Sequence, residues 1–252
     1  MLVQLSRYYG QSPETLTSDQ IKSYLYYCKE KRSLSNAHIN QTISALKLLY
    51  RDVLGKDWDA SIKIKRPRRG HYMPDILSKQ EVASMICVTP NLKHKAIIGL
   101  LYSSGIRLGE LLNLRLDEID SDRMIIRVNH GKGNISRDAI LAAKTLELLR
   151  QYYAHSCPKP LIYIFESWGK RGNRYSGSSV RKIIKRACVK AGIKKNIFPH
   201  SLRHAFATHM LEQGTNLKLI QKLLGHRSLS STMVYLHLAA IDPSIKSPLD
   251  QL

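Results

Sequence analysis

The stretch from residue 63 to residue 74 divides this chain, because it is rich in basic residues and has no apolar periodicity. The segments on either side show apolar residues at helical spacing, whereas this one has no face to bury. We therefore predict a basic linker at 63–74 between a domain at 1–62 and a larger domain at 75–240. A tail at 241–252 completes the chain.

The first segment carries clear helix signals. Thr17 and Gln20 form a capping-box pattern ahead of an apolar segment. Ser35 is placed to cap a longer helix whose apolar residues recur at helical spacing until Gly55 ends it. The sequence predicts a small helical domain.

The second segment mixes helices with one hairpin. Ser78 and Glu81 form another capping box, and helical patterns dominate from Ser178 onward. Between them, strand-like residues 124–128 and 135–140 flank the turn sequence His-Gly-Lys-Gly-Asn. We predict a mainly α fold with a small antiparallel β-sheet.

The net charge points to a polyanionic partner. The chain has 40 Lys and Arg against 19 Asp and Glu, a formal charge of +21, which favours nucleic acid over a membrane surface. No apolar run approaches the roughly 18–20 residues of a membrane span, and no signal peptide opens the chain. The cysteines are scattered, which is typical of reduced thiols in a cytoplasmic protein. They are Cys28, Cys87, Cys157 and Cys188.

Two basic segments are candidates for DNA contact. A helix starting near Ser178 is predicted to bury one apolar face and to turn its basic residues outward, a form that can present cations to phosphates or enter a major groove. Its basic residues are Arg181, Lys182, Lys185 and Arg186, and those of the linker are Lys65, Arg66, Arg68 and Arg69. An ordinary solvated basic surface is the alternative.

A set of polar residues suits the chemistry of a phosphodiester. Arginine grips two phosphate oxygens with a planar fork, and transfer of a phosphoryl group depends mainly on positioning and charge neutralisation. A tyrosine hydroxyl among such cations can act as the nucleophile. The set is Arg107, Lys132, His200, Arg203, His226 and Tyr235. The chain has 13 tyrosines, so chemistry alone does not select one.

The Pro199-His200 segment supports two interpretations. Proline often starts a helix, and His200 and Arg203 would share the positive N-terminal end, which suits an anion. His200 and His204 also have the spacing of two zinc ligands, but Ser201 stands where a metalloprotease helix has glutamate. We therefore expect neither a metal nor another cofactor.

Five motifs in order resemble the tyrosine recombinase (phage integrase) family, and most closely its simple Xer-like members. They are Gly-Ile-Arg-Leu-Gly-Glu at 105–110, His-Gly-Lys-Gly-Asn at 130–134, His-Ser-Leu-Arg-His at 200–204, Leu-Leu-Gly-His at 223–226 and Ser-Thr-Met-Val-Tyr at 231–235. The resemblance covers about residues 75–238. It selects Tyr235 among the tyrosines.

The resemblance implies a two-domain, C-shaped clamp on double-stranded DNA and metal-independent, site-specific cleavage and rejoining through a 3′-phosphotyrosyl intermediate. Arg107 and Arg203 would hold the scissile phosphate, Lys132 would protonate the leaving oxygen, and Tyr235 would attack. His200 and His226 would occupy the family's two histidine positions. The resemblance further implies inverted-repeat sites, a tetrameric assembly on DNA, and integration, excision or resolution of an element. The N-terminal segment is shorter than the family's usual clamp domain.

Three other functions remain open from sequence alone. A type IB topoisomerase would share the fold and the chemistry but relax supercoils as a monomer. A DNA-binding regulator would keep the fold and lack the chemistry, against which the intact residue set argues. A zinc-dependent hydrolase is disfavoured by the absence of a nearby acidic residue.

Overall fold

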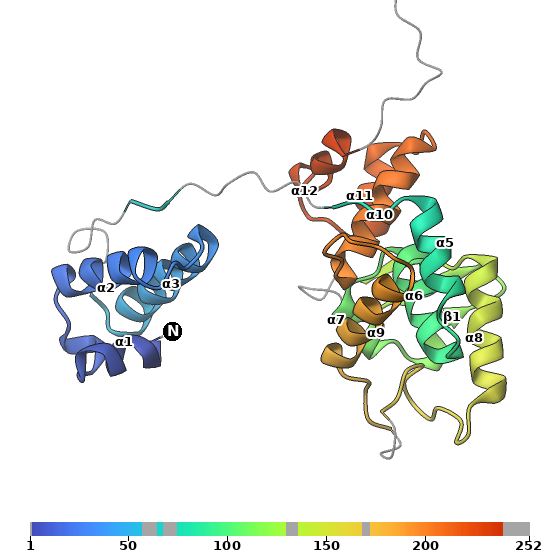
Figure 1. The fold of residues 1–252 in the computed structure, drawn as a ribbon, viewed down its shortest axis with the longest axis horizontal. Coiled ribbons are helices and arrows are strands. Elements are labelled where there is room, and N and C mark those ends of the chain that lie inside the picture. The colour runs from blue at the N-terminus through green and yellow to red at the C-terminus, as the bar shows by residue number, and fades with distance from the viewer. Residues whose placement is uncertain (1, 57–64, 68–74, 130–135, 168–171, 239–252) are drawn as a thin grey trace, which may run out of the picture. The chain divides into compact units, whose positions relative to one another are not determined.

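The computed structural model describes residues 2–56, 65–67, 75–129, 136–167 and 172–238. The chain divides into two compact units, Met1–Tyr72 and Met73–Leu252 (Figure 1). The division falls inside the stretch that the sequence marks as a linker. None of the described helices is long and apolar enough to cross a membrane.

The first unit is a small helical domain. Thr17 accepts a hydrogen bond from the Gln20 amide, and the Gln20 side chain accepts one from the Thr17 amide, so the predicted capping box is confirmed. Ser35 caps the following helix, as predicted. The elements are α1 (Leu2–Tyr9), the 3-10 turn η1 (Pro13–Thr15), α2 (Ser18–Glu30), α3 (Asn36–Leu48) and the π turn η2 (Leu49–Val53). The core comprises Leu5, Ile21, Leu25, Ile43 and Leu46, among others.

Part of the basic stretch packs on α3. The Asn40 side-chain amide donates to the Pro67 carbonyl at 2.9 Å, and an Arg66 guanidinium nitrogen donates to the Ser44 hydroxyl at 3.1 Å. Residues 65–67 therefore belong structurally to the first unit.

The second unit is built around α6 (Leu92–Ser104), whose residues Ala96–Leu101 are all buried. A helix that is apolar on every side must be surrounded by partners, and α6 packs against five other helices of this unit. These are α5 (Lys79–Cys87), α7 (Leu108–Asn113), α8 (Ala143–His155), α9 (Gly177–Lys190) and α10 (Pro199–Glu212). The chain continues through α11 (Leu217–Leu224), α12 (Ser230–Met233) and the 3-10 turn η4 (Val234–His237).

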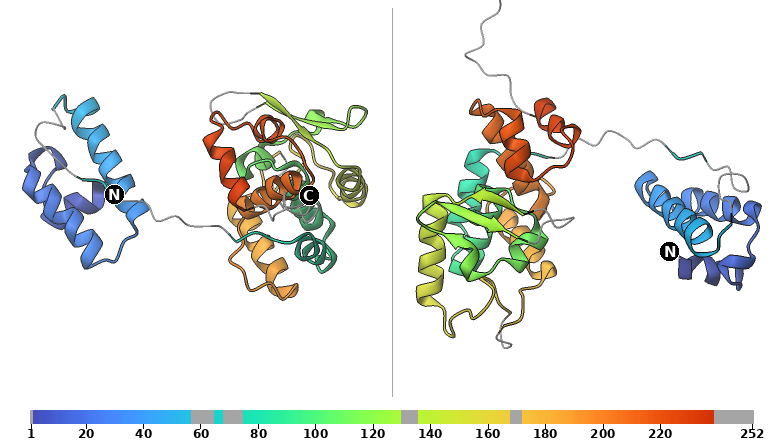
Figure 2. Two further views of the ribbon diagram at one scale, coloured as in Figure 1. Left: turned by 90° about the horizontal axis from the view of Figure 1, so that it is seen from above. Right: turned by 180° about the vertical axis from the view of Figure 1, so that it is seen from behind.

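A three-stranded antiparallel sheet lies on the outside of these helices (Figure 2). β2 (Ile125–Val128) pairs with β3 (Arg137–Ile140), with Ile126 opposite Ala139, so the predicted hairpin pairing is confirmed. β1 (Ile119–Asp120), which follows the 3-10 turn η3 (Leu116–Glu118), adds an edge strand that was not predicted. Met124 was predicted to begin β2, but it has φ +54° and lies in the preceding turn. The mainly α fold with a small antiparallel sheet is confirmed.

The break after α6 requires a glycine. Gly105 has φ +61°, and a Cβ built there would lie 2.5 Å from Cδ1 of Phe206 on α10. Both the left-handed backbone and the close approach of α10 therefore exclude a side chain. This turn brings the Gly105 carbonyl to the face of α10.

We predict that Gly105→Ala destabilises the second unit by at least about 2 kcal/mol, because it combines a strained φ with overpacking against Phe206. Gly109→Ala is the matched control, since a Cβ there contacts nothing within 4 Å and alanine favours a helix by up to about 1 kcal/mol. Urea unfolding measures both. Equal stability of the two variants would contradict the packing argument.

Candidate active site

Arg203 is the centre of the site and is fully buried in α10. One terminal nitrogen donates to the Gly105 carbonyl at 2.6 Å and the other to the Leu224 carbonyl at 2.7 Å. Burial, together with the charge of Arg107, lowers the pKa of Arg203 to about 10, which leaves it protonated at neutral pH. The guanidinium thus joins the end of α6 to the end of α11.

Arg107 begins α7 and is tied to Glu110. Its backbone amide and one guanidinium nitrogen each donate to the Glu110 carboxylate at 2.8 Å. Its other terminal nitrogen donates to the Gly225 carbonyl at 3.3 Å. The sequence leaves a surface position or an ion pair with Glu110 as the ordinary alternatives for this arginine, and the ion pair forms. The side chain is nevertheless 30% exposed, so it remains open to a ligand.

Arg137 on β3 completes this arrangement, although the sequence did not single it out. Its terminal nitrogens donate to both Glu110 oxygens at 2.9 and 2.7 Å, and its Nε donates to the Leu223 carbonyl at 2.9 Å. Burial alone would raise the pKa of Glu110, but the hydrogen bonds from Arg137 and Arg107 outweigh it and lower the pKa to about 2. Glu110 is therefore a carboxylate between two cations.

The C-terminal end of α11 is held by three arginines in succession. The carbonyls of Leu223, Leu224 and Gly225 accept from Arg137, Arg203 and Arg107 respectively. The last carbonyls of a helix lack partners within the helix and carry partial negative charge, so they suit cations. The next residue along the chain is His226, whose position is thereby fixed.

His226 faces the nucleophile candidate. Its Nδ1 lies 2.9 Å from the Thr232 hydroxyl, and its ring stacks on that of Tyr235, with centroids 6.2 Å apart and planes at 13°. Burial and the neighbouring arginines, Arg203 first, lower the pKa of His226 to about 4. The imidazole is neutral at pH 7 and can offer one N–H to a phosphate oxygen.

Tyr235 lies in η4 and is only 1% exposed. It packs with apolar residues of α10 and α11, including Phe206 and Leu224. Burial raises the pKa of Tyr235, while the charges of Arg203 and Arg107 act in the opposite direction. The structure therefore places this hydroxyl-bearing ring in the same cluster as the two arginines.

His200 and His204 follow one another along α10, with ring centroids 4.4 Å apart. His200 lies near the N-terminus of α10, with part of its surface exposed to solvent. Desolvation of the remaining part and the charges of Arg203 and Arg107 lower its pKa. Burial and His200 lower the pKa of His204 to about 4, and its ring lies 5.5 Å from that of Tyr235. Within the described ranges, no group of three His, Cys, Asp or Glu residues is placed to hold a metal ion.

The remaining predicted residues are distributed as follows. Lys132, Arg68 and Arg69 lie outside the described residues. Lys65 is exposed, and Arg66 contacts α3. On α9 the predicted division is confirmed, since the apolar face is buried while the basic residues are exposed. Those exposed residues are Arg181, Lys182, Lys185 and Arg186.

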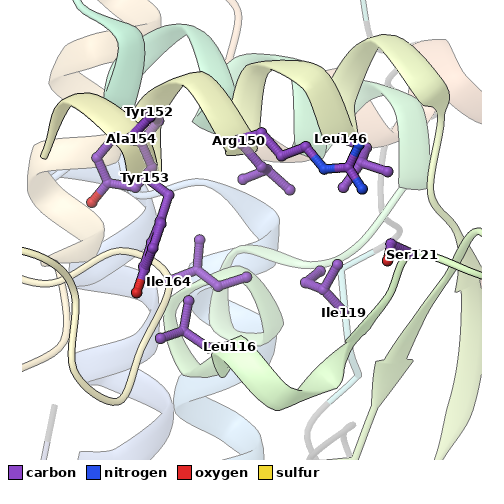
Figure 3. A pocket seen from close by; sticks show the side chains of 10 residues that line it. Leu116, Ile119, Ser121, Leu146, Arg150, Tyr152, Tyr153, Ala154 and Ile164 are labelled. Carbon is purple, nitrogen blue, oxygen red and sulfur yellow. The ribbon is translucent and has the colours of Figure 1, made fainter.

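A hollow of about 700 Å³ opens beside the arginine cluster, between β3 and α11. Several basic side chains line it, including Arg137, Lys218 and Lys222, together with His226. A separate, more apolar pocket of about 390 Å³ lies between α8 and the β1 region (Figure 3). Its lining, which includes Leu116, Tyr152 and Ile164, shares no residue with the site.

Comparison with known proteins finds relatives for both units of the chain. Residues 75–241 match the phage integrase family, and residues 1–60 match the N-terminal SAM-like domain of phage integrases. The chain is 37% identical to y4qK of Sinorhizobium fredii, provisionally named an integrase/recombinase, over 93% of this chain and 75% of that protein. It is 34% identical to the tyrosine recombinase XerA of Pyrococcus horikoshii over 92% of this chain and 79% of that one.

Solved structures show the same fold. A crystal structure of XerA recombinase superposes with a TM-score of 0.61 at 30% identity, covering 96% of this chain and 84% of the other. The XerH site-specific recombinase in its post-cleavage complex gives 0.73 at 22% identity, covering 92% and 71%, and supports the fold alone.

The buried Arg203, the partly exposed Arg107, two imidazoles of lowered pKa and a tyrosine form a cluster whose chemistry suits a phosphodiester. The chain belongs to the phage integrase family of tyrosine recombinases, and it is an enzyme that cleaves and rejoins DNA at specific sites.

We predict that His204 makes the protein acid-sensitive. A histidine with a folded pKa near 4 and an ordinary unfolded pKa favours the unfolded chain as pH falls through about 6.5 towards 4. His204→Gln should therefore lose less stability than the wild type between pH 7 and pH 5, by about 1 kcal/mol after solvent screening. Urea unfolding at the two pH values measures this. Identical losses would contradict it.

Proposed function

We propose that Arg107 and Arg203 bind the scissile phosphate of duplex DNA and that Tyr235 attacks it. The observation that carries this proposal is the convergence of both arginines on the end of α11, beside the His226–Tyr235 stack. Arg203 uses only two of its donors on protein carbonyls, and guanidinium has five. Donors fixed in a dry site stabilise developing charge without reorganising.

The histidines act as neutral groups in this proposal. His226 donates a hydrogen bond to a phosphate oxygen, and His200, whose pKa is lowered, accepts or orients the proton of Tyr235. Since the phenol is 1% exposed and burial raises its pKa, η4 must shift for the oxygen to reach phosphorus. The Tyr235 hydroxyl then loses its proton as it attacks phosphorus, not before.

The bond changes balance without an external energy source. The Tyr235 oxygen forms a bond to phosphorus, the bond to the 5′ oxygen breaks, and Lys132 supplies the proton to that oxygen. The 3′-phosphotyrosyl link conserves the phosphodiester bond energy. A 5′-hydroxyl from a partner duplex then attacks the link and releases Tyr235, which joins the strands. This sequence serves integration, excision or resolution of an element.

The basic helix α9 and the basic stretch at 65–69 supply the wider DNA contact in the proposal. The cations of α9, Lys65 and Arg66 are exposed and suit a phosphate backbone. Solved structures hold XerH on palindromic difH DNA and the Tn1549 integrase on circular-intermediate DNA, and the palindromic substrate supports inverted-repeat sites. The proposal also includes assembly of four copies of the chain on DNA. A cytoplasmic location on the nucleoid follows from this substrate.

Tyr235→Phe should abolish the covalent protein–DNA adduct and leave the dissociation constant for DNA within about threefold, because only the attacking oxygen is lost. Tyr153→Phe, which alters an exposed tyrosine of α8, is the matched control and should form adducts normally. The protein is incubated with labelled plasmid fragments, and denaturing gels detect the covalent adduct that it forms. Adducts formed by the Tyr235→Phe variant would refute the nucleophile assignment.

The role of α9 is tested by salt. Replacing Arg181 and Lys185 with alanine should reduce the slope of log K against log salt by roughly 2, since each phosphate contact contributes about 0.9. The control replaces the exposed Lys144 and Arg150 of α8 and should leave the slope unchanged. Fluorescence anisotropy with a labelled duplex measures both, and equal slopes for the two double variants would place the DNA elsewhere.

A further inference from the structure

We propose that Arg137 is a positioning residue for strand cleavage, which holds Glu110 and the end of α11 and so places Arg107 and His226 against the phosphate. This inference rests on the proposed function and adds a residue to its machinery. Arg137 is assigned no contact with DNA, because each of its guanidinium nitrogens already donates to a protein partner. It acts through the groups that it contacts.

Arg137 is committed to protein partners through every nitrogen. Its two terminal nitrogens take both Glu110 oxygens, and its Nε takes the Leu223 carbonyl. A bidentate arginine–carboxylate pair fixes direction as well as distance. The guanidinium therefore forms a rigid bridge from α7 to the end of α11.

The first consequence concerns Arg107. Glu110 is the only acidic partner recorded for both arginines among the described residues. Because Arg137 occupies both carboxylate oxygens, Arg107 shares Glu110 through one nitrogen at 2.8 Å and retains a long 3.3 Å contact to the Gly225 carbonyl. Without Arg137 the carboxylate would be free to take the whole fork of Arg107. Arg137 thus keeps donors of Arg107 available for phosphate.

The second consequence concerns His226. The Arg137 stem lies against the backbone just before it, because a Cβ on Gly225 would be 2.8 Å from the Arg137 Cδ. The same side chain donates to the Leu223 carbonyl. Arg137 therefore contacts the backbone of the residues before and after Leu224. A displacement of about 1 Å in a reacting group can cost about 10²-fold in rate.

A purely structural ion pair predicts a different effect when Arg137 is replaced. If Arg137 only stabilised the fold, its loss would lower stability, DNA binding and cleavage together. A positioning role lowers the cleavage rate far more than binding, and it changes the surroundings of His226. The experiment must separate these outcomes.

The test compares Arg137→Met and Arg137→Lys with a control, Arg127→Met, on the neighbouring strand. Arg127 is half-exposed and pairs with Asp120 at 2.7 Å. Single-turnover adduct formation is measured on a duplex carrying the cleavage site mapped with the wild-type protein. We expect Arg137→Met to react about 10²-fold more slowly with a dissociation constant within about threefold. The lysine variant should be intermediate, and the control should match the wild type.

A second readout does not require cleavage. In ¹³C-histidine NMR, the His226 ring should titrate at higher pH in Arg137→Met than in the wild type, because a nearby positive charge and the tight packing of α11 are both reduced. The other groups that lower this pKa, namely Arg203, Arg107 and His200, remain. Arg127→Met should leave the titration unchanged.

Two results would overturn the inference. One is a cleavage rate for Arg137→Met within about threefold of the wild type. The other is a parallel loss of rate, binding and melting temperature that Arg137→Lys shares fully. Failure of the proposed function is distinguishable, since it would appear as the absence of a Tyr235-dependent adduct in the wild-type protein, while the His226 titration would still report on Arg137.

Discussion

The site depends on one interaction, the binding of three consecutive carbonyls at the end of α11 by three arginines from different elements. Arg137 comes from β3, Arg203 from α10 and Arg107 from the start of α7. Helix ends carry partial negative charge and unpaired carbonyls, so this end replaces the acidic side chains that would otherwise be needed to hold so many cations. Glu110 is paired with two of these three guanidiniums, so a net positive charge remains available for a phosphate.

This arrangement also sets the state of the histidines. Burial, together with the concentrated positive charge, lowers the pKa values of both His204 and His226 to about 4, which keeps the rings neutral. The buried Glu110 carboxylate lies between Arg107 and Arg137 and offsets part of the repulsion between the arginines. The site thus places both cationic guanidiniums and neutral imidazole rings around Tyr235.

Sequence patterns predicted much of this and missed a definable remainder. Capping residues such as Thr17 and Ser78 fixed helix starts because their signals are local. The ordered motifs identified Arg107, Arg203, His226 and Tyr235, which the structure gathers. Arg137 was missed because its role depends on Glu110, a partner 27 residues away in the sequence. The one sequence signal for it was its place on the same strand face as the buried Ala139, where a charged side chain needs a partner. The edge strand β1 was missed because its two residues are too few to show an alternation of apolar and polar side chains.

The most direct measurement of the central claim is single-turnover cleavage by Arg203→Lys. Lysine keeps the charge, but one ammonium cannot span the carbonyls of Gly105 and Leu224, which Arg203 joins at 2.6 and 2.7 Å, and still grip a phosphate through two donors. The account predicts a rate at least about 10²-fold lower with DNA affinity changed less than about threefold. A wild-type rate, or equal losses of rate and affinity, would contradict it.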